Sequence, residues 1–192
     1  MAYIWFMAIE VASKEAADRL KASFDTSPVT LMGVVITFAT SVSRVEDLWW
    51  GVMVMPCCDG PEPLSDSGGA ESEEHAKLMT EVGRVLYERL FRSAPFDVAI
   101  LGAEPEGFYG FGDHEELVQD LKAGDDRIDG LVISSALWEA AGKPKAVVSP
   151  AKGYYWIPWR GESFSVDPSP VLFVSRACSY ESALSFVSGF GP

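Results

Sequence analysis

The chain has 192 residues, 48% of them hydrophobic and 12% aromatic, enough to bury a large core, which excludes intrinsic disorder of the whole chain. Its formal net charge of -13 opposes binding to nucleic acid and to anionic membrane surfaces. Three cysteines, an odd number in a chain without an export signal pattern, exclude a disulfide framework.

The N-terminal segment is apolar, but it lacks the basic residues and the small-residue cleavage pattern of a secretory signal. No window of the sequence approaches the roughly 18 uninterrupted apolar residues that a membrane helix needs. We therefore expect a cytoplasmic protein that binds neither membranes nor nucleic acid.

The first half of the sequence predicts six regular elements in the order strand, helix, strand, strand, helix, strand. Apolar runs indicate the strands, and apolar residues at three- and four-residue spacing indicate the helices. Ser13 is suited to cap the first helix, and the Gly- and Pro-containing stretch 56–70 is typical of a surface loop. The expected ranges are 2–10, 13–24, 29–41, 48–55, 71–92 and 96–101.

This order of elements is that of the ferredoxin-like split βαβ fold, in which two helices cover one face of an antiparallel sheet. We predict an α+β fold with a ferredoxin-like βαββαβ core over residues 1–103. Residues 104–192 are predicted to be an α/β extension packed on this core, so that residues 1–192 form a single domain. Within the extension we expect helices at 114–121, 135–141 and 179–187, and strands at 131–133, 154–159 and 171–174.

The acidic residues are distributed unevenly along the chain. No Lys or Arg occurs between Arg44 and Lys77, a stretch with eight carboxylates, or between Arg92 and Lys122, a stretch with seven. Together these stretches hold more than half of the 28 acidic residues. A negative field that is not neutralised locally attracts basic partners. We expect these carboxylates to gather on one exposed surface that binds a basic protein.

No catalytic or cofactor motif accompanies this charge pattern. There is no Gly-x-Ser-x-Gly elbow, and the two histidines, His75 and His114, are interpreted as solvated polar residues. Neighbouring helical residues such as Asp113, His114, Glu115 and Glu116 point in different directions and cannot share a metal ion. A reduced, structural role is expected for the cysteines. We therefore expect no cofactor and no metal.

An enzyme that acts on a small molecule is the alternative interpretation. Glu104 and Glu106 follow the predicted strand 96–101, a position where active sites often lie, and Cys57 is the better candidate among the cysteines. This alternative requires a deep pocket beside the end of that strand and a carboxylate with a raised pKa in it. A third interpretation is a mimic of nucleic acid, with carboxylates spaced like phosphates along an elongated face.

Aromatic residues lie among the carboxylates of the second cation-free stretch. Aromatic anchors surrounded by charge of one sign are typical of protein–protein interfaces with fast, electrostatically steered association. The residues that we predict to contact a basic partner are Glu104, Glu106, Phe108, Tyr109, Asp113, Glu115, Glu116, Asp120, Asp125 and Asp126.

Three short segments give the chain a resemblance to a known group of proteins. They are Leu48-Trp49-Trp50-Gly51, Asp129-Gly130-Leu131-Val132-Ile133-Ser134 and Tyr155-Trp156-Ile157-Pro158-Trp159-Arg160-Gly161. With its small size, acidic character and α+β pattern, the chain resembles the immunity proteins of bacterial polymorphic toxin systems. The resemblance implies a non-enzymatic inhibitor that binds a cognate toxin domain and occludes its active site.

Overall fold

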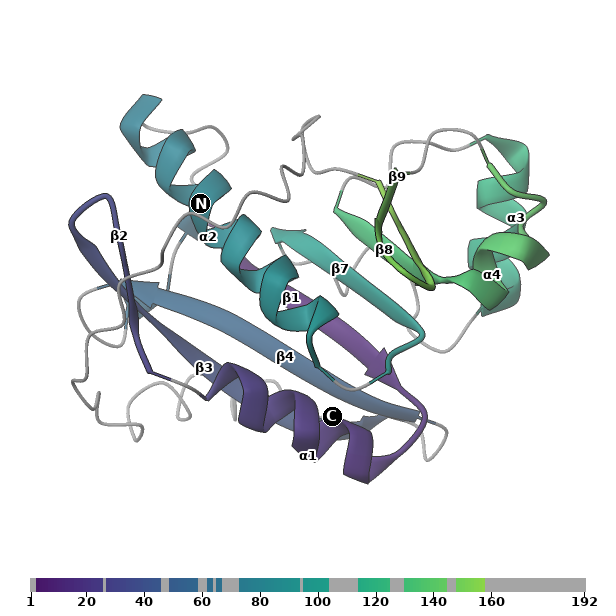
Figure 1. The fold of residues 1–192 in the computed structure, drawn as a ribbon, viewed down its shortest axis with the longest axis horizontal. Helices are drawn as coiled ribbons and strands as arrows, with labels where there is room; N and C mark the ends of the chain where they lie inside the picture. Colours follow the sequence, from purple (N-terminus) through teal and green to yellow (C-terminus); the bar gives the residue numbers. More distant parts are fainter. Residues whose placement is uncertain are drawn as a thin grey trace.

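The computed structural model describes residues 3–25, 27–45, 49–58, 62–63, 65–66, 73–93, 95–103, 114–124, 130–144 and 148–157. In this part of the chain four helices accompany one β-sheet, which makes the fold α+β (Figure 1). The helices are α1 (Lys14–Phe24), α2 (Glu73–Phe91), α3 (His114–Ala123) and α4 (Ser135–Ala140). None of the described helices is both long and apolar enough to cross a membrane.

Ten described strands form the sheet, and every pair of neighbouring strands is antiparallel. Eight of them follow one path in the order β2-β3-β4-β1-β7-β8-β10-β9, while β5 pairs with β4 and β6 with β1. The strands are β1 (Tyr3–Val11), β2 (Val29–Leu31), β3 (Val34–Val45), β4 (Trp49–Cys58), β5 (Glu62–Pro63), β6 (Ser65–Asp66), β7 (Val98–Ala103), β8 (Leu131–Ser134), β9 (Val148–Ala151) and β10 (Tyr154–Trp156).

The central strand β1 divides its side chains between two layers, because successive residues of a strand point to opposite faces of the sheet. Met7 and Ile9 pack in the larger apolar cluster with buried residues of α1 and α2. Phe6 and Ala8 pack in the second cluster, which contains apolar residues of α3 and lies on the opposite face. By the same alternation Glu10 belongs to the α3 face. Figure 1 shows α1 and α2 crossing the strands, with α3 and α4 together beside β8.

Helix α1 forms because a good cap precedes a regular apolar stripe. The Ser13 hydroxyl accepts the backbone N–H of Ala16 at 3.2 Å and so satisfies a donor at the helix start. The buried residues recur at three- and four-residue spacing, which gives one face to the sheet. They are Ala16, Ala17, Leu20 and Phe24.

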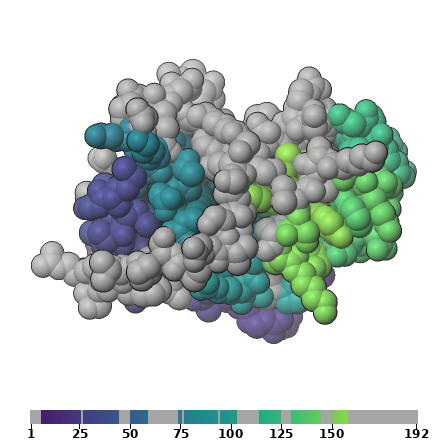
Figure 2. All heavy atoms as spheres, turned by 45° about the horizontal axis from the view of Figure 1, so that its top comes forward, coloured from purple at the N-terminus to yellow at the C-terminus, as the bar shows by residue number. Residues whose placement is uncertain are grey.

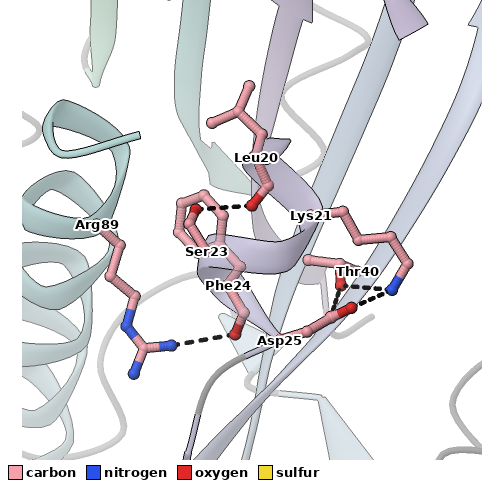
Figure 3. Close-up of polar contacts among 7 residues, drawn as sticks. All are labelled: Leu20, Lys21, Ser23, Phe24, Asp25, Thr40 and Arg89. Atoms are coloured by element: carbon pink, nitrogen blue, oxygen red, sulfur yellow. Dashed lines mark hydrogen bonds and ion pairs between the residues drawn. The ribbon is translucent and has the colours of Figure 1, made fainter. Parts of the chain in front are cut away.

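The guanidinium of Arg89 on α2 fastens the end of α1 (Figure 3). It donates to the carbonyl oxygen of Phe24 at 3.1 Å. It also donates to the carbonyl oxygen of Ser27 at 3.2 Å. The guanidinium carbon also lies 4.4 Å from the ring centroid of Phe38, a cation–π distance. Burial lowers the pKa of Arg89 to about 10, so the side chain keeps its charge at neutral pH. One side chain thereby joins α1, α2 and β3.

The structure confirms most of the elements expected from the sequence and divides one of them. The expected strand 29–41 is two strands, β2 and β3, joined by a turn at Met32 and Gly33 with φ angles of 49° and 83°. Two positive φ angles give the tight hairpin turn that suits the twist of antiparallel strands. The expected loop 56–70 contains β5 and β6, and β4 continues to Cys58. Strand β9 was not expected.

The extension contributes to the same sheet as the first half of the chain. Strand β8 pairs with β7, and β10 pairs with β8, so the sheet is larger than the four strands predicted for the core. Helices α3 and α4 cover the face opposite α1 and α2. The expected helix 179–187 and strand 171–174 lie outside the described residues.

Candidate functional site

Glu10 is the one buried acidic residue in the described part of the chain, with 4% of its surface exposed. It lies near the end of β1, where its register partners are Gly51 on β4 and Val98 on β7. Neither partner carries a charge. A buried carboxylate is costly unless it is paired or hydrogen-bonded, so the position of Glu10 requires a partner from outside the sheet.

One such partner is His114, the first residue of α3. Its Nε2 atom lies 2.8 Å from Oε1 of Glu10, which is an ion-pair distance when the imidazole is protonated. The Nε2 atom itself is buried, although 38% of the His114 side chain is exposed. The imidazole therefore connects a buried carboxylate to solvent, and it ties the start of α3 to the sheet.

Asp97 brings a second carboxyl group to the same place. The residue precedes β7, and its backbone N–H donates to the carbonyl of Glu10 at 3.0 Å. Its own carbonyl accepts the N–H of Ser134 at 2.9 Å, which fixes the segment between β1 and β8. Burial raises the pKa of the Asp97 carboxyl; the charge of His114 opposes this shift, and that of Glu10 adds to it. Glu10, Asp97 and His114 form one electrostatic group.

This group can exchange a proton with solvent through the imidazole and can hold a positive charge between two carboxylates. A pair consisting of a half-exposed imidazole and a buried carboxylate is also the usual arrangement of a general base. Among the described residues no group of three or more His, Cys, Asp or Glu side chains is placed to hold a metal ion.

Helix α3 also carries the predicted partner-binding residues that the structure describes. Glu115 and Glu116 are exposed in its first turn, and Asp120 is half-buried one turn later. Leu117 and Leu121 are buried on the opposite side of the helix. In the described ranges neither Glu115 nor Asp120 takes part in an ion pair. Figure 2 shows the atoms of α3 and α4 forming one edge of the molecule.

Several acidic residues on α1 and α2, or just past them, are in a different situation, because basic residues of the same helix pair with them. Lys14 lies 2.7 Å from Asp18 on α1. Lys21 pairs with Asp25, which also accepts a hydrogen bond from the hydroxyl of Thr40 (Figure 3). On α2 the guanidinium of Arg84 pairs with two glutamates, Glu81 and Glu88. The expectation of a single gathered anionic surface therefore does not extend to these paired residues.

Seven of the ten predicted partner-binding residues lie outside the described residues. These are Glu104, Glu106, Phe108, Tyr109, Asp113, Asp125 and Asp126. The two glutamates of the alternative enzyme interpretation are among them. Among the described carboxylates, Asp97 has a raised pKa, and it lies before the start of β7. The alternative interpretation placed such a carboxylate at the other end of this strand.

Cys57 is buried in β4, and its thiol donates to the carbonyl of Met55 at 3.7 Å. A thiol in such a position is structural and poorly accessible to a reactant, so the geometry gives no support to a nucleophilic role.

Sequence reasoning did not find the Glu10, Asp97 and His114 group. The interpretation of His114 as a solvated residue is wrong for its Nε2 atom, which is buried against Glu10. One signal was present: Glu10 occupies an inward register with Phe6 and Ala8 in an otherwise apolar strand, and such a residue needs a partner.

Comparison with known proteins identified no relative of this chain. No protein-family model matches the chain, and no significant match occurs among curated proteins or among solved structures.

Proposed function

We propose that the protein is an acidic, non-enzymatic binding protein that neutralises a basic protein partner, as an immunity protein neutralises a bacterial toxin domain. The observation that carries the proposal is the contrast between helices. On α1 and α2 the carboxylates of Asp18, Glu81 and Glu88 are paired within their own helix, whereas Glu115 and Asp120 on α3 form no ion pair with described residues. The surface of α3 thus presents uncompensated negative charge.

Unpaired carboxylates act over a longer range than paired ones, because an adjacent cation cancels most of the field of a carboxylate. A surface of one sign accelerates encounter with an oppositely charged partner and orients it before contact. The net charge of -13 adds a general attraction for a basic protein. The exposed acidic first turn of α3 then determines where on the surface the basic protein binds.

For the core of the fold we infer a ferredoxin-like arrangement of residues 1–103. The sheet order β3-β4-β1-β7 supports this inference, since it places the first and third long strands of the segment side by side at the centre. The packing of α1 and α2 against the same apolar cluster supports it as well.

The experiment compares two double variants that remove equal charge. Glu115→Gln with Asp120→Asn neutralises α3, and Glu15→Gln with Asp18→Asn neutralises exposed residues of α1. The partner is the basic protein that co-purifies with the tagged chain from its native host, and association rates are measured by stopped flow at low and physiological salt. We expect the α3 variant to associate about 10-fold more slowly at low salt, and the α1 variant to change by less than about 2-fold.

Equal slowing by the two variants would show that only net charge matters, and it would remove α3 from the proposal. Association of the wild type that is insensitive to salt, or the absence of any basic protein that co-purifies with the tagged chain, would overturn the proposal itself. Because Glu115 also complements the dipole of α3, thermal unfolding of both variants is recorded to separate binding from folding.

A further inference from the structure

Two aromatic rings on the α3 side of the sheet form a parallel stack near the surface. Trp138 on α4 and Tyr155 on β10 are both half-buried, with ring centroids 3.8 Å apart and an angle of 11° between the ring planes. The indole N–H of Trp138 donates to the carbonyl oxygen of Pro144 at 3.3 Å, which fixes the orientation of the ring. The indole is therefore held in place, and Tyr155 covers one of its two faces.

The other face of Trp138 carries a cation from the same chain. Nζ of Lys143 lies over the ring, 5.5 Å from its centroid. Because the ring of Tyr155 fills one face, the ammonium lies over the opposite one. This distance is close to the limit of about 6 Å for a cation–π interaction. Lys143 is exposed and, within the described ranges, takes part in no ion pair, so its side chain is held only loosely.

The backbone after α4 turns back so that Lys143 comes to lie beside the indole. Its φ angle is 62°, a left-handed conformation that residues with a side chain rarely adopt. The N–H of Lys143 donates to the carbonyl oxygen of Trp138 at 3.0 Å, and this bond closes the turn. Residues held in such a conformation are concentrated at functional positions. The turn thus brings a cation to the open face of Trp138 at an energetic cost, which points to a role for that face.

We propose that the face of Trp138 opposite Tyr155 binds an arginine side chain of the basic protein partner, and that Lys143 occupies this face while the partner is absent. The inference rests on the proposed function and names a contact that the partner makes. A guanidinium is planar and more weakly hydrated than an ammonium, so it stacks on an indole better than Lys143 does. Tryptophan and arginine are also enriched among the residues that dominate the energy of protein–protein binding.

The charges around Trp138 suit such a partner. Helices α3 and α4 lie side by side at one edge of the molecule (Figures 1 and 2). Glu139 is exposed on α4, and Glu115 and Asp120 on α3 form no ion pair with described residues. A basic protein that is attracted to α3 therefore arrives beside Trp138, where its arginine displaces the ammonium of Lys143 into solvent. The carboxylates supply attraction at long range, and the indole supplies a contact at short range.

Nuclear magnetic resonance of the full chain tests the site with acetyl-arginine amide as the probe. The assigned indole N–H resonance of Trp138 reports binding, and acetyl-citrulline amide is the uncharged control. Two variants remove the same charge, Lys143→Gln beside the ring and Lys152→Gln at the exposed turn before β10. We expect the arginine probe to bind Lys143→Gln about 3-fold more tightly than the wild type, as for release of one exposed cation–π contact. Lys152→Gln should bind it as the wild type does, and the citrulline probe should not shift the resonance.

Three results of this titration would overturn the proposal: no saturable shift with the arginine probe in Lys143→Gln, equal shifts with the two probes, or equal affinities of the two variants. The variants are then compared with the basic protein that co-purifies with the tagged chain. Lys143→Gln should dissociate from it about 3-fold more slowly than Lys152→Gln, and equal dissociation would also overturn the proposal. The small probe needs no partner protein, and the α3 variants leave Trp138 unchanged, so this inference and the proposed function can fail separately.

Discussion

Gly130 occupies a position that no other residue can take, because the backbone of β7 comes too close to it. Its φ angle is +83°, and a Cβ atom there would lie 2.1 Å from the carbonyl oxygen of Leu101. The close approach of the two backbones allows Gly130 to form hydrogen bonds with neighbouring segments. The carbonyl of Gly130 accepts from the N–H of Leu101 at 3.2 Å and from the hydroxyl of Tyr87 at 3.1 Å, while its N–H donates to Ile157.

We expect Gly130→Ala to lower the free energy of unfolding by more than about 3 kcal/mol, from the backbone clash and the positive φ together. The control is Gly142→Ala, where φ is +79° but nothing lies within 4 Å of the added Cβ. It should cost only about 1 kcal/mol, for the left-handed backbone alone. Urea denaturation measures both, and equal losses would contradict the close approach of β7.

Single residues also show what the sequence could reveal and what it could not. Ser13 was recognisable as a cap because capping depends on residues only three positions apart. Asp97 and His114 both lie more than 80 positions from Glu10 in the sequence, and no local pattern encodes their partnership with it. A lone acidic residue in an apolar strand indicates that a partner exists, but it does not indicate which one.

At the level of elements, the sequence was informative wherever periodicity or a breaker was strong. Regular apolar spacing predicted both long helices and the long strands, with ends within a few residues of those observed. It missed the break in 29–41 because Met32 is an unusual residue for a position with positive φ. It missed β9, whose Pro150 is tolerated at the edge of the sheet and looks like a strand breaker.

The connection between α1 and α2 depends on the shape of one side chain. Arg89→Lys keeps the charge, but an ammonium cannot donate in a fixed fork to two carbonyls and stack on Phe38. We expect a loss of about 2 kcal/mol in the free energy of unfolding, measured by urea denaturation. Arg92→Lys at the exposed position just past α2 is the control and should change stability by less than about 0.5 kcal/mol. Comparable losses would show that Arg89 acts only through its charge.

On the scale of the whole molecule, the first half of the sequence identified the α+β class, and the second half was understood less well. Residues after 103 were predicted to pack on a finished core, but β8, β10 and β9 extend the same sheet beyond β7. Strand order is decided by which edge is open and which apolar face fits. Those are relations between distant segments, so periodicity along the chain cannot supply them.

The net negative charge of the molecule should lower the free energy of unfolding, and added salt should reduce this loss. A folded chain with a net charge of -13 brings like charges together, and screening reduces their repulsion. We expect the free energy of unfolding at pH 7 to rise by about 1 kcal/mol between 10 and 200 mM sodium chloride. Near pH 4.5, the sequence pI, the same change of salt should have little effect. A salt response of equal size at both pH values would show that ion-specific effects, and not repulsion, are responsible.

The central position of β1 also has a consequence for how the molecule is made. β1 leaves the ribosome before both of its main neighbours, and Met7 pairs with Leu101, which is translated 94 residues later. At about 5 to 20 residues per second, this apolar segment waits roughly 5 to 20 s for its last partner strand. Both of its edges are open to other nascent chains until β4 has emerged, and the edge that β7 will cover stays open for the whole interval. A chaperone that holds short apolar strands should therefore bind the growing polypeptide at β1 and release it once β7 has emerged.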